Sequence, residues 1–113
     1  MLFRSGGGAL PYQIGRFKSA SYRGPGEPFE VSIRRLYYDT CMYSRNALDL
    51  LFKEVGPDRC LFGAENPGMG SSADPTTGEQ MDDLAPIVES IDWLTSSQKT
   101  AIFEGNARSL FRL

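Results

Sequence analysis

Residues 36–65, "LYYDTCMYSRNALDLLFKEVGPDRCLFGAE", place two strand-like runs on either side of a helical pattern. The run at 36–41 is rich in β-prone residues, and a second run at 60–65 begins with an apolar segment. Between them, apolar residues recur at helical spacing over 47–55. A strand, a helix and a second strand in this order predict parallel strands joined by a right-handed crossover. The fold class is therefore predicted to be α/β.

The limits of the central helix can also be read from the sequence. Ser44 or Asn46 can cap its start, and Gly56 followed by Pro57 ends it. Both strand-like runs are almost continuously apolar, which is typical of strands covered on both faces. A sheet of two or three such strands leaves edges that need cover from elsewhere. The aromatic residues that we expect to pack, rather than to stack on a ligand, are Tyr12, Phe17, Tyr37 and Tyr38.

Further elements are predicted on both sides of this unit. A weak helical pattern at 12–23 follows three glycines, and a loop rich in Pro and Gly at 24–30 comes after it. The loop at 66–81 is long enough to suggest a function. The remaining predicted elements are a helix from about Asp82, a short helix from a capping box at 95–98 to Gly105, and a last turn capped by Asn106.

The composition describes an ordinary globular chain. Its 113 residues suffice for one small domain, 1–113, and fall short of the ~200 to 250 residues of a complete α/β barrel. Twelve Lys and Arg against fourteen Asp and Glu leave no basic excess for nucleic-acid binding. No apolar run approaches the ~18 residues of a membrane span. The sequence predicts a cytoplasmic protein that binds neither nucleic acid nor membrane.

The two cysteines are predicted to be reduced. Cys41 ends one predicted strand and Cys60 begins the next, so they lie at opposite ends of neighbouring parallel strands, about five rises of ~3.3 Å apart. A disulfide requires Cα atoms within ~7 Å of each other. Neither cysteine has the CxxC spacing of a redox or zinc motif.

Two carboxylates stand where chemistry is expected in a parallel sheet. Asp39 and Glu65 each lie near the carboxyl end of a predicted strand, so they would project from the same rim. Acid/base or metal chemistry could be done there. The alternative is that these acids cap the helices that follow or pair with Arg45. Because the chain has no histidine, ligation by Asp and Glu alone would suit Mg²⁺, Mn²⁺ or Ca²⁺ better than zinc.

A second candidate site is the glycine run between the first residues and the first helical pattern. The N–H groups that Gly6, Gly7 and Gly8 expose could hold a phosphate or a carboxylate, and Arg16 could add positive charge. The run matches neither the GxGxxG fingerprint nor the GxxxxGK[ST] loop. The alternative is a tight turn that needs unusual backbone angles.

Five segments taken together resemble the C-terminal part of the amidohydrolase-related metal-dependent enzymes, and within them the 4-oxalomesaconate hydratase type. The segments are "GGGALPYQIGRF", "LYYDTCMY", "LFGAENPG", "DPTTG" and "IFEGNARSLFRL". Their order and spacing cover nearly the whole chain, and this makes the resemblance more specific than any one of them.

The resemblance implies a TIM-like (β/α)₈ barrel, of which the chain would hold the last two βα units and the end of the unit before them. It implies that Glu65 ligates a catalytic zinc, where most relatives in the wider superfamily carry Asp. It also implies that Gly6, Gly7, Gly8 and Arg16 line the pocket of a polycarboxylate substrate, with Asp39 on the same rim. The family's His-x-His motif and a further metal-binding His lie outside this chain. Where relatives tend to place a His before the glycines, this sequence has Ser5.

The resemblance therefore predicts part of a zinc-dependent lyase or hydrolase. The main hypothesis is a hydratase that acts on a small unsaturated polycarboxylate. The isolated chain is expected to be inactive, because a zinc site requires three or four ligands. Two alternatives remain open. One is a non-catalytic α/β module that binds an anionic ligand or a partner chain and could form a homo-oligomer. The other is a fragment of a related decarboxylase.

Overall fold

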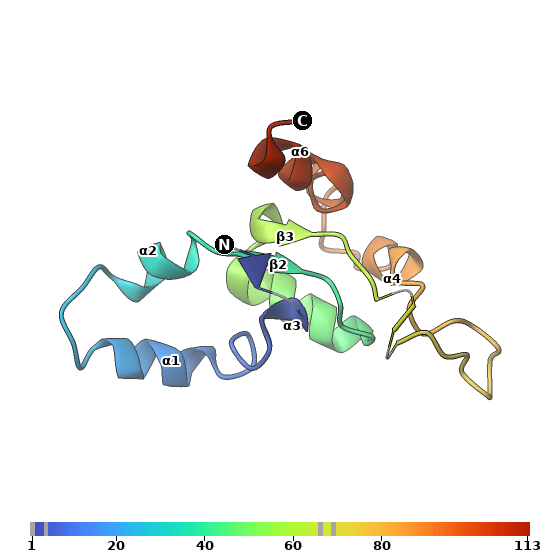
Figure 1. Ribbon diagram of the computed structural model, residues 1–113, viewed down its shortest axis with the longest axis horizontal. Coiled ribbons are helices and arrows are strands. Elements are labelled where there is room, and N and C mark those ends of the chain that lie inside the picture. Colours follow the sequence, from blue (N-terminus) through green and yellow to red (C-terminus); the bar gives the residue numbers. More distant parts are fainter. Residues whose placement is uncertain (1, 4, 66, 69) are drawn as a thin grey trace.

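The computed structural model describes residues 2–3, 5–65, 67–68 and 70–113. Three short strands form one parallel sheet in the order β1-β2-β3 (Figure 1). The strands are β1 (Leu2–Phe3), β2 (Tyr37–Asp39) and β3 (Cys60–Leu61). The pairing joins Tyr38 to Phe3 on one side and to Cys60 on the other. The predicted α/β class and the parallel direction of the strands are confirmed.

Helical segments occupy the connections. Before and between the strands they are η1 (Ser5–Gly7), α1 (Ile14–Ser21), α2 (Phe29–Ile33), α3 (Arg45–Val55) and η2 (Pro57–Arg59). After β3 they are α4 (Ala85–Glu89), α5 (Ser96–Thr100), η3 (Ala101–Gly105, a π-helical turn) and α6 (Asn106–Phe111). No described helix is both long and apolar enough to cross a membrane.

The helix α3 forms as the sequence predicts. Of its two candidate caps, Ser44 is the one used, because its Oγ accepts a hydrogen bond from the Ala47 N–H at 3.3 Å. The helix ends at Gly56, whose N–H donates to the Phe52 carbonyl. Its buried face packs against the sheet, and the main core also takes in residues from the segments after β3. The core residues are Tyr38, Leu48, Leu51, Phe52, Val55, Cys60, Val88, Ile91, Leu94 and Ile102.

The C-terminal helices differ from the prediction in one respect. The capping box is confirmed, since Thr95 Oγ1 accepts from the Gln98 N–H and Gln98 Oε1 accepts from the Thr95 N–H. Asn106, however, caps no helix. The chain runs on through the π-helical turn, and Asn106 Nδ2 donates instead to the carbonyls of Pro57 and Cys60, both at 2.8 Å. These two bonds tie the C-terminal helix to β3.

The helix predicted from about Asp82 begins three residues later, at Ala85. The residues before it form turns, in which the Leu84 N–H donates to the Asp82 carbonyl. Pro86 lies in the first turn of the helix, where its missing N–H costs nothing. Burial of Leu84 and Val88 fixes this short helix against the core.

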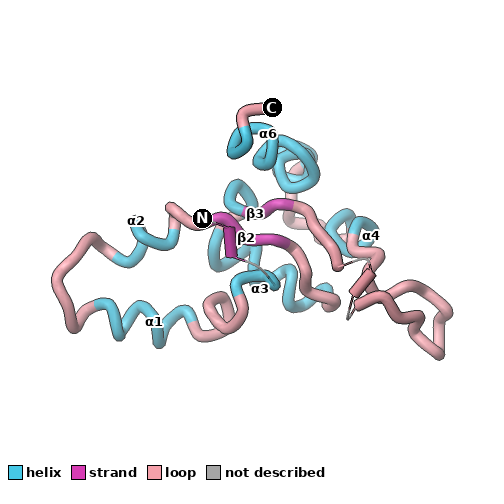
Figure 2. Tube along the Cα trace, viewed as in Figure 1, coloured by secondary structure: helices cyan, strands magenta, loops and turns pink. Residues whose placement is uncertain are grey.

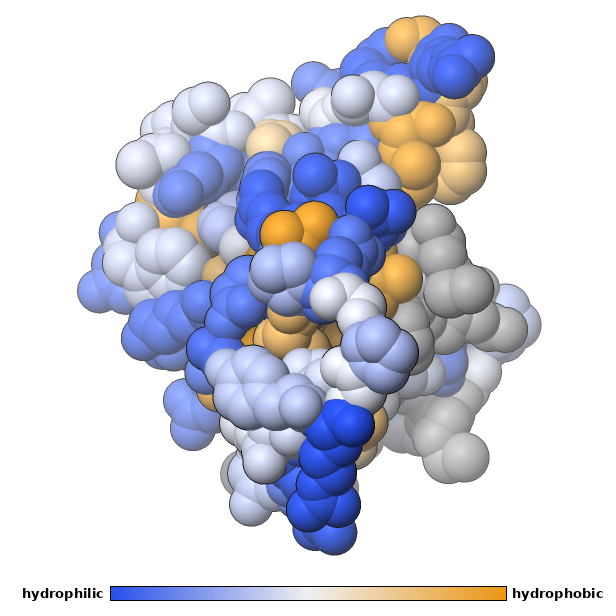
Figure 3. Space-filling model, turned by 90° about the vertical axis from the view of Figure 1, so that its left-hand side faces the viewer, coloured by the Kyte–Doolittle hydropathy of each residue, from blue (hydrophilic) through white to orange (hydrophobic). Residues whose placement is uncertain are grey.

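Helices α1 and α2 form an arm that extends from the sheet (Figure 2). Neither helix has a buried residue. Tyr12 is 79% exposed and Phe17 45% exposed, so the expectation that these two residues pack is wrong, whereas Tyr38 is fully buried. Because of the arm, the radius of gyration is 15.0 Å, against about 13 Å for a compact domain of this size. Figure 3 views the molecule from the side of the arm and shows a hollow with apolar surface inside it, surrounded by hydrophilic residues.

Candidate functional site at the carboxyl edge of the sheet

The candidate residues gather where the three strands end. Ser5 and the glycines come directly after β1, Asp39 is the last residue of β2, and Glu65 lies in the segment that follows β3. Since the strands are parallel, these segments leave the sheet at the same edge, as Figure 2 shows. In α/β folds the binding and catalytic groups lie at these carboxyl ends of the strands. Asp39 and Glu65 thus follow neighbouring parallel strands on the same side of the sheet, as predicted. The predicted strand over 60–65 is shorter than expected, since β3 ends at Leu61 and Glu65 lies four residues beyond it.

Asp39 is held by backbone N–H groups from two segments. Its Oδ1 accepts from the Gly6 N–H at 2.8 Å and from the Cys41 N–H at 3.2 Å, and its Oδ2 accepts from the Ser5 N–H at 3.1 Å. Both carboxylate oxygens are therefore engaged. Two of the N–H groups in the glycine segment already have an anion as their partner, and that anion belongs to the protein.

The glycine segment is a left-handed turn. Ser5, Gly6, Gly7 and Gly8 have φ values of 52°, 62°, 84° and 60°. A Cβ atom added at Gly6 would overlap the side chain of Met42, so another residue there would need this side chain to move as well as an unfavourable positive φ. The tight turn with unusual backbone angles, which the sequence offered as the alternative to an anion site, is thus present. Whether its remaining surface holds substrate stays a prediction.

Glu65 contacts a tyrosine that the sequence analysis did not single out. The Tyr43 hydroxyl donates to Glu65 Oε2 at 3.3 Å. Burial raises the pKa of the Tyr43 hydroxyl, and the negative charge of Glu65 beside it raises the pKa further, so Tyr43 stays protonated at neutral pH and can donate this hydrogen bond. A Cβ atom at Gly70 would lie 2.2 Å from Cζ of the Tyr43 ring, so the long loop passes directly over this ring.

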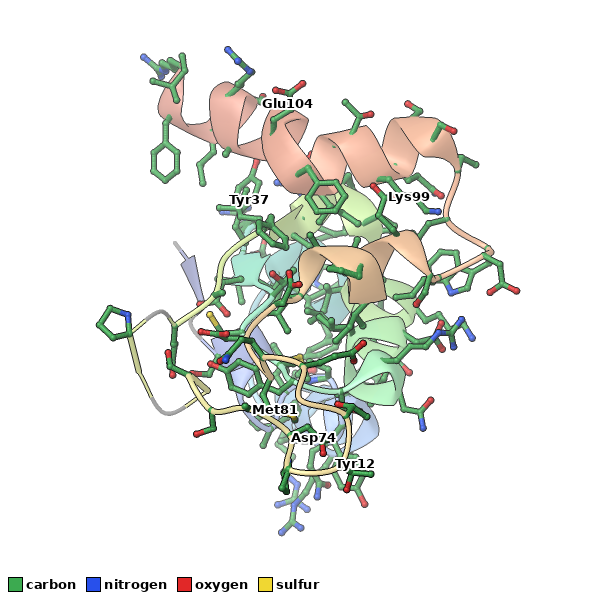
Figure 4. The ribbon with its side chains drawn as sticks, turned by 90° about the vertical axis from the view of Figure 1, so that its right-hand side faces the viewer. Tyr12, Tyr37, Asp74, Met81, Lys99 and Glu104 are labelled. Atoms are coloured by element: carbon green, nitrogen blue, oxygen red, sulfur yellow. The ribbon has the colours of Figure 1, made fainter. Side chains whose placement is uncertain are left out.

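The hydroxyl of Ser71 fixes the backbone after Glu65. Ser71 Oγ lies 2.9 Å from the Glu65 carbonyl and 3.0 Å from Asp82 Oδ2, and it accepts from the Gly68 N–H at 3.0 Å. These contacts close the loop just after the candidate carboxylate. The rest of the loop extends outward, and Figure 4 shows Asp74 and Met81 far from Lys99 and Glu104 on the C-terminal helices. Asn66 and Met69 of this loop lie outside the described residues.

A cleft beside the long loop is acidic. Its volume is about 600 Å³, and its lining includes Tyr43, Asp74, Glu79, Asp82 and Asp83. Four carboxylates repel a ligand that is itself a polycarboxylate. The cleft is therefore a poor site for a ligand that carries several negative charges.

Two predicted residues do not join the cluster. Arg16 is exposed on the first turn of α1, and the described residues show no hydrogen bond or ion pair between its side chain and the other candidates. The alternative that Arg45 pairs with the rim acids is wrong. Its guanidinium contacts the Ser90 carbonyl at 3.1 Å and Asp92 Oδ1 at 3.2 Å instead.

The residues of this chain do not complete a metal site. Within the described part of the chain, no group of three or more His, Cys, Asp or Glu side chains is placed to hold a metal ion. Glu65 could supply one ligand, whereas zinc takes at least three from protein. Cys60 is no substitute, because burial raises the pKa of its thiol and keeps it protonated. Neither Cys41 nor Cys60 forms a disulfide.

Sequence reasoning missed Thr40 as well as Tyr43. Thr40 Oγ1 donates to the Gly63 carbonyl at 2.9 Å and accepts from the Gly63 N–H at 3.0 Å. The position of Thr40 directly after Asp39, at the end of a strand, was the available signal. Its partner lies 23 residues further along the chain, so only the paired strands reveal the contact.

A parallel α/β sheet with carboxylates where its strands end is common to several classes of α/β protein, and comparison with known proteins specifies the family. The chain belongs to the amidohydrolase family, which matches residues 8–113. The 2-keto-4-carboxy-3-hexenedioate hydratase of Sphingobium sp. (strain NBRC 103272 / SYK-6) is 34% identical over 107 residues. That alignment covers 94% of this chain and 31% of the hydratase.

Solved structures agree with this assignment. The 4-oxalomesaconate hydratase of Rhodopseudomonas palustris matches with a TM-score of 0.90 and 34% identity, over 98% of this chain and 34% of the hydratase. The 5-carboxyvanillate decarboxylase of Novosphingobium aromaticivorans, solved with manganese, has a TM-score of 0.72 and 19% identity, over 99% of this chain and 32% of the decarboxylase. The chain thus spans about a third of the length of these amidohydrolase barrel proteins. Some relatives bind a divalent metal, namely manganese.

Proposed function

We propose that this chain is the C-terminal part of a metal-dependent hydratase that acts on a small unsaturated polycarboxylate. It would supply the last two βα units of a (β/α)₈ barrel and the end of the unit before them. One observation carries the proposal. Over nearly its whole length the chain is 34% identical to each of two hydratases of such compounds, whereas the decarboxylases that share its fold are 19–22% identical.

Within this enzyme, we assign Glu65 as a ligand of a zinc ion. The other ligands would come from parts of the barrel beyond this chain. The placement of Glu65 after β3 and its contact with the protonated Tyr43 hydroxyl support an anionic side chain held at the rim. The enzyme would work in the cytoplasm, and it could be a homo-oligomer.

The glycine turn would face the carboxylates of the substrate. Gly6, Gly7 and Gly8 follow β1 on the side of the sheet where Glu65 lies. Gly6 and Gly7 are buried, so the surface that a ligand can reach is at Gly8, where nothing lies within 4 Å of a Cβ position. Arg16 would add positive charge from the first turn of α1, which begins six residues after Gly8. The charge of the substrate favours this end of the rim over the acidic cleft beside the long loop.

The first test uses the isolated chain. With added zinc it should show no hydration of 4-oxalomesaconate above the buffer blank, because it holds one of the three or four ligands that a zinc site needs. Turnover comparable to that of a complete hydratase would contradict the proposal.

The second test supplies the rest of the barrel. The C-terminal third of the Rhodopseudomonas palustris hydratase is replaced by this chain, and the chimera is assayed for hydration of 4-oxalomesaconate and for bound zinc. We expect activity, and in the variant Glu65→Gln a loss of zinc affinity and activity of about 100-fold or more. Glu79→Gln is the matched control, because Glu79 is an exposed acid in the distal part of the long loop. A folded, zinc-loaded chimera without turnover would contradict the assignment, and so would full zinc binding by Glu65→Gln.

A further inference from the structure

Two consecutive residues at the end of the middle strand reach in opposite directions. The strand ladders stop at the pairs Phe3 with Tyr38 and Asp39 with Leu61. Beyond these pairs, side chains of the middle strand take over. Asp39 holds the turn after β1, and Thr40 holds the segment after β3. We call Asp39 and Thr40 the rim clasp.

The Asp39 side of the rim clasp stabilises a costly backbone. Ser5 is not a glycine, yet its φ is 52°, in the left-handed region that L-residues rarely adopt. The N–H groups of Ser5 and Gly6 converge on one carboxylate, at 3.1 Å and 2.8 Å. Hydrogen bonds to a charged acceptor are stronger than neutral ones. The carboxylate can therefore keep the left-handed turn in place.

The Thr40 side of the rim clasp is fully buried. Its side chain is 0% exposed, and its single hydroxyl both donates to and accepts from the backbone of Gly63. Gly63 precedes Glu65 by two residues, so the hydroxyl determines where the chain leaves β3 on its way to Glu65. Valine has the same shape but could make neither bond, and it would leave both backbone groups without this partner.

We propose that Asp39 and Thr40 are positioning residues, which set the glycine turn and Glu65 at a fixed spacing across the rim without reacting themselves. This role rests on the proposed function, because the spacing matters for catalysis only where both segments face one substrate. Asp39 is a poor general base in this arrangement, since three N–H groups already occupy its two oxygens. The middle strand thus aligns the strands on either side of it.

The test is amide hydrogen exchange of the 113-residue chain, measured residue by residue by NMR. In Asp39→Asn, exchange at Ser5 and Gly6 should become about tenfold faster, because a neutral amide replaces a charged acceptor, and exchange at Gly63 should stay unchanged. In Thr40→Val the pattern should reverse, with Gly63 about tenfold faster and the glycine turn unchanged. Thr40→Ser keeps the hydroxyl and should restore the exchange of Gly63 to its original rate.

The control is Asp92→Asn, an exposed acid whose loss should alter neither set of amides. If Thr40→Val unfolds, exchange through the whole chain becomes fast, and the contrast between Thr40→Ser and Asp39→Asn then decides the question. The proposal is overturned if Thr40→Ser also releases Gly63, if Asp39→Asn leaves Ser5 and Gly6 protected, or if either of these variants affects both sides alike. The exchange measurement needs neither metal nor substrate, so its outcome is separate from that of the hydratase assay.

Discussion

Helices α1 and α3 both show the apolar spacing of an amphipathic helix, but only α3 has a core to pack against. Four residues of α3 are buried, while α1 has none. Phe17 on α1 is 45% exposed, whereas Phe52 on α3 is 1% exposed. The comparison teaches that hydrophobic periodicity identifies the face that needs cover and leaves open which element provides it.

The groove beside the arm is a second apolar surface that lacks cover. Its lining is largely apolar and includes Leu10, Phe17, Phe29, Ile33 and Leu36. The described residues leave this groove open, whereas the corresponding face of α3 is closed by the sheet and by Val88, Ile91 and Ile102. Contacts in the arm should therefore contribute little to the stability of the chain, and contacts around α3 should contribute most of it.

The largest contrast is expected between two phenylalanines. Phe52→Ala should lower the free energy of unfolding by about 3 to 5 kcal/mol, because it empties a closed part of the core. Phe17→Ala, the matched control on the arm, should lower it by less than about 1 kcal/mol, since the ring is already half in solvent. Urea denaturation followed by circular dichroism measures both. Equal losses for the two variants would show that the arm is as well packed as the core.

A smaller effect is expected where the C-terminal helix meets β3. Asn106→Ala should cost about 2 to 3 kcal/mol, because it removes both hydrogen bonds to the carbonyls of Pro57 and Cys60. Asn46→Ala, at an exposed position on α3, should change the free energy of unfolding by less than about 0.5 kcal/mol. The two variants compare the same side chain inside and outside the hydrogen-bond network in one denaturation experiment. If Asn106→Ala leaves the free energy of unfolding unchanged, the π-helical turn holds the C-terminal helix in place without the Asn106 side chain.

Alkaline pH should weaken the core through Tyr38. Burial raises the pKa of its hydroxyl to about 12, against about 10 for an exposed tyrosine. A raised pKa in the folded state means that the unfolded chain loses this proton first, so stability is intact below pH ~10 and falls as the pH approaches ~12, by up to about 2 kcal/mol. Cys60 acts in the same direction, because burial raises the pKa of its thiol as well.

Denaturation with urea at several values between about pH 8 and pH 11 measures this effect. In Tyr38→Phe the decline above pH ~10 should be shallower than in the parent chain, while the part that Cys60 causes should remain. The arm carries no buried hydroxyl of this kind. If the two pH profiles coincide, the Tyr38 hydroxyl is hydrated in the folded chain.

The smallest effect is expected at a helix cap. Thr95→Ala should cost about 1 kcal/mol, because the Oγ1 that accepts from the Gln98 N–H is lost, and Thr95→Ser should retain most of the stability. In the arm, Gln13 holds the equivalent place before α1 and makes no side-chain cap bond, so Gln13→Ala should be neutral. A thermal melt of the three variants is sufficient. Equal shifts for Thr95→Ala and Gln13→Ala would remove this difference between the core and the arm.

The sequence predicted what depends on neighbours along the chain. The cap at Ser44, the end of α3 at Gly56 and the capping box at Thr95 all involve residues within four positions of each other, and all three are confirmed. The placement of Asp39 and Glu65 at one edge follows from the strand order alone, and it is confirmed as well.

The features that could not be predicted depend on distant partners. Thr40 contacts Gly63, Tyr43 contacts Glu65, and Asn106 contacts residues almost fifty positions away. A hydroxyl or an amide in a sequence can bond water, a cap or a neighbouring strand, and only tertiary packing selects among them. The exposure of Tyr12 was missed for the same reason, because an aromatic residue has no local signal for whether a core lies within its reach.

The crowding around the glycine turn has a consequence for how the sequence can vary. A Cβ atom would meet Met42 at Gly6 and the Tyr38 ring at Gly7, whereas nothing lies within 4 Å of such an atom at Gly8. In a library that randomises the three codons and is screened for folded protein, Gly7 should return glycine alone, because the buried Tyr38 ring has no room to move. Gly6 should strongly favour glycine, because of its positive φ and the Met42 side chain beside it. The third should also return asparagine and aspartate, which tolerate its φ of 60°. Gly8 is therefore the position of this motif that tolerates substitution best, and it lies at the exposed end of the turn.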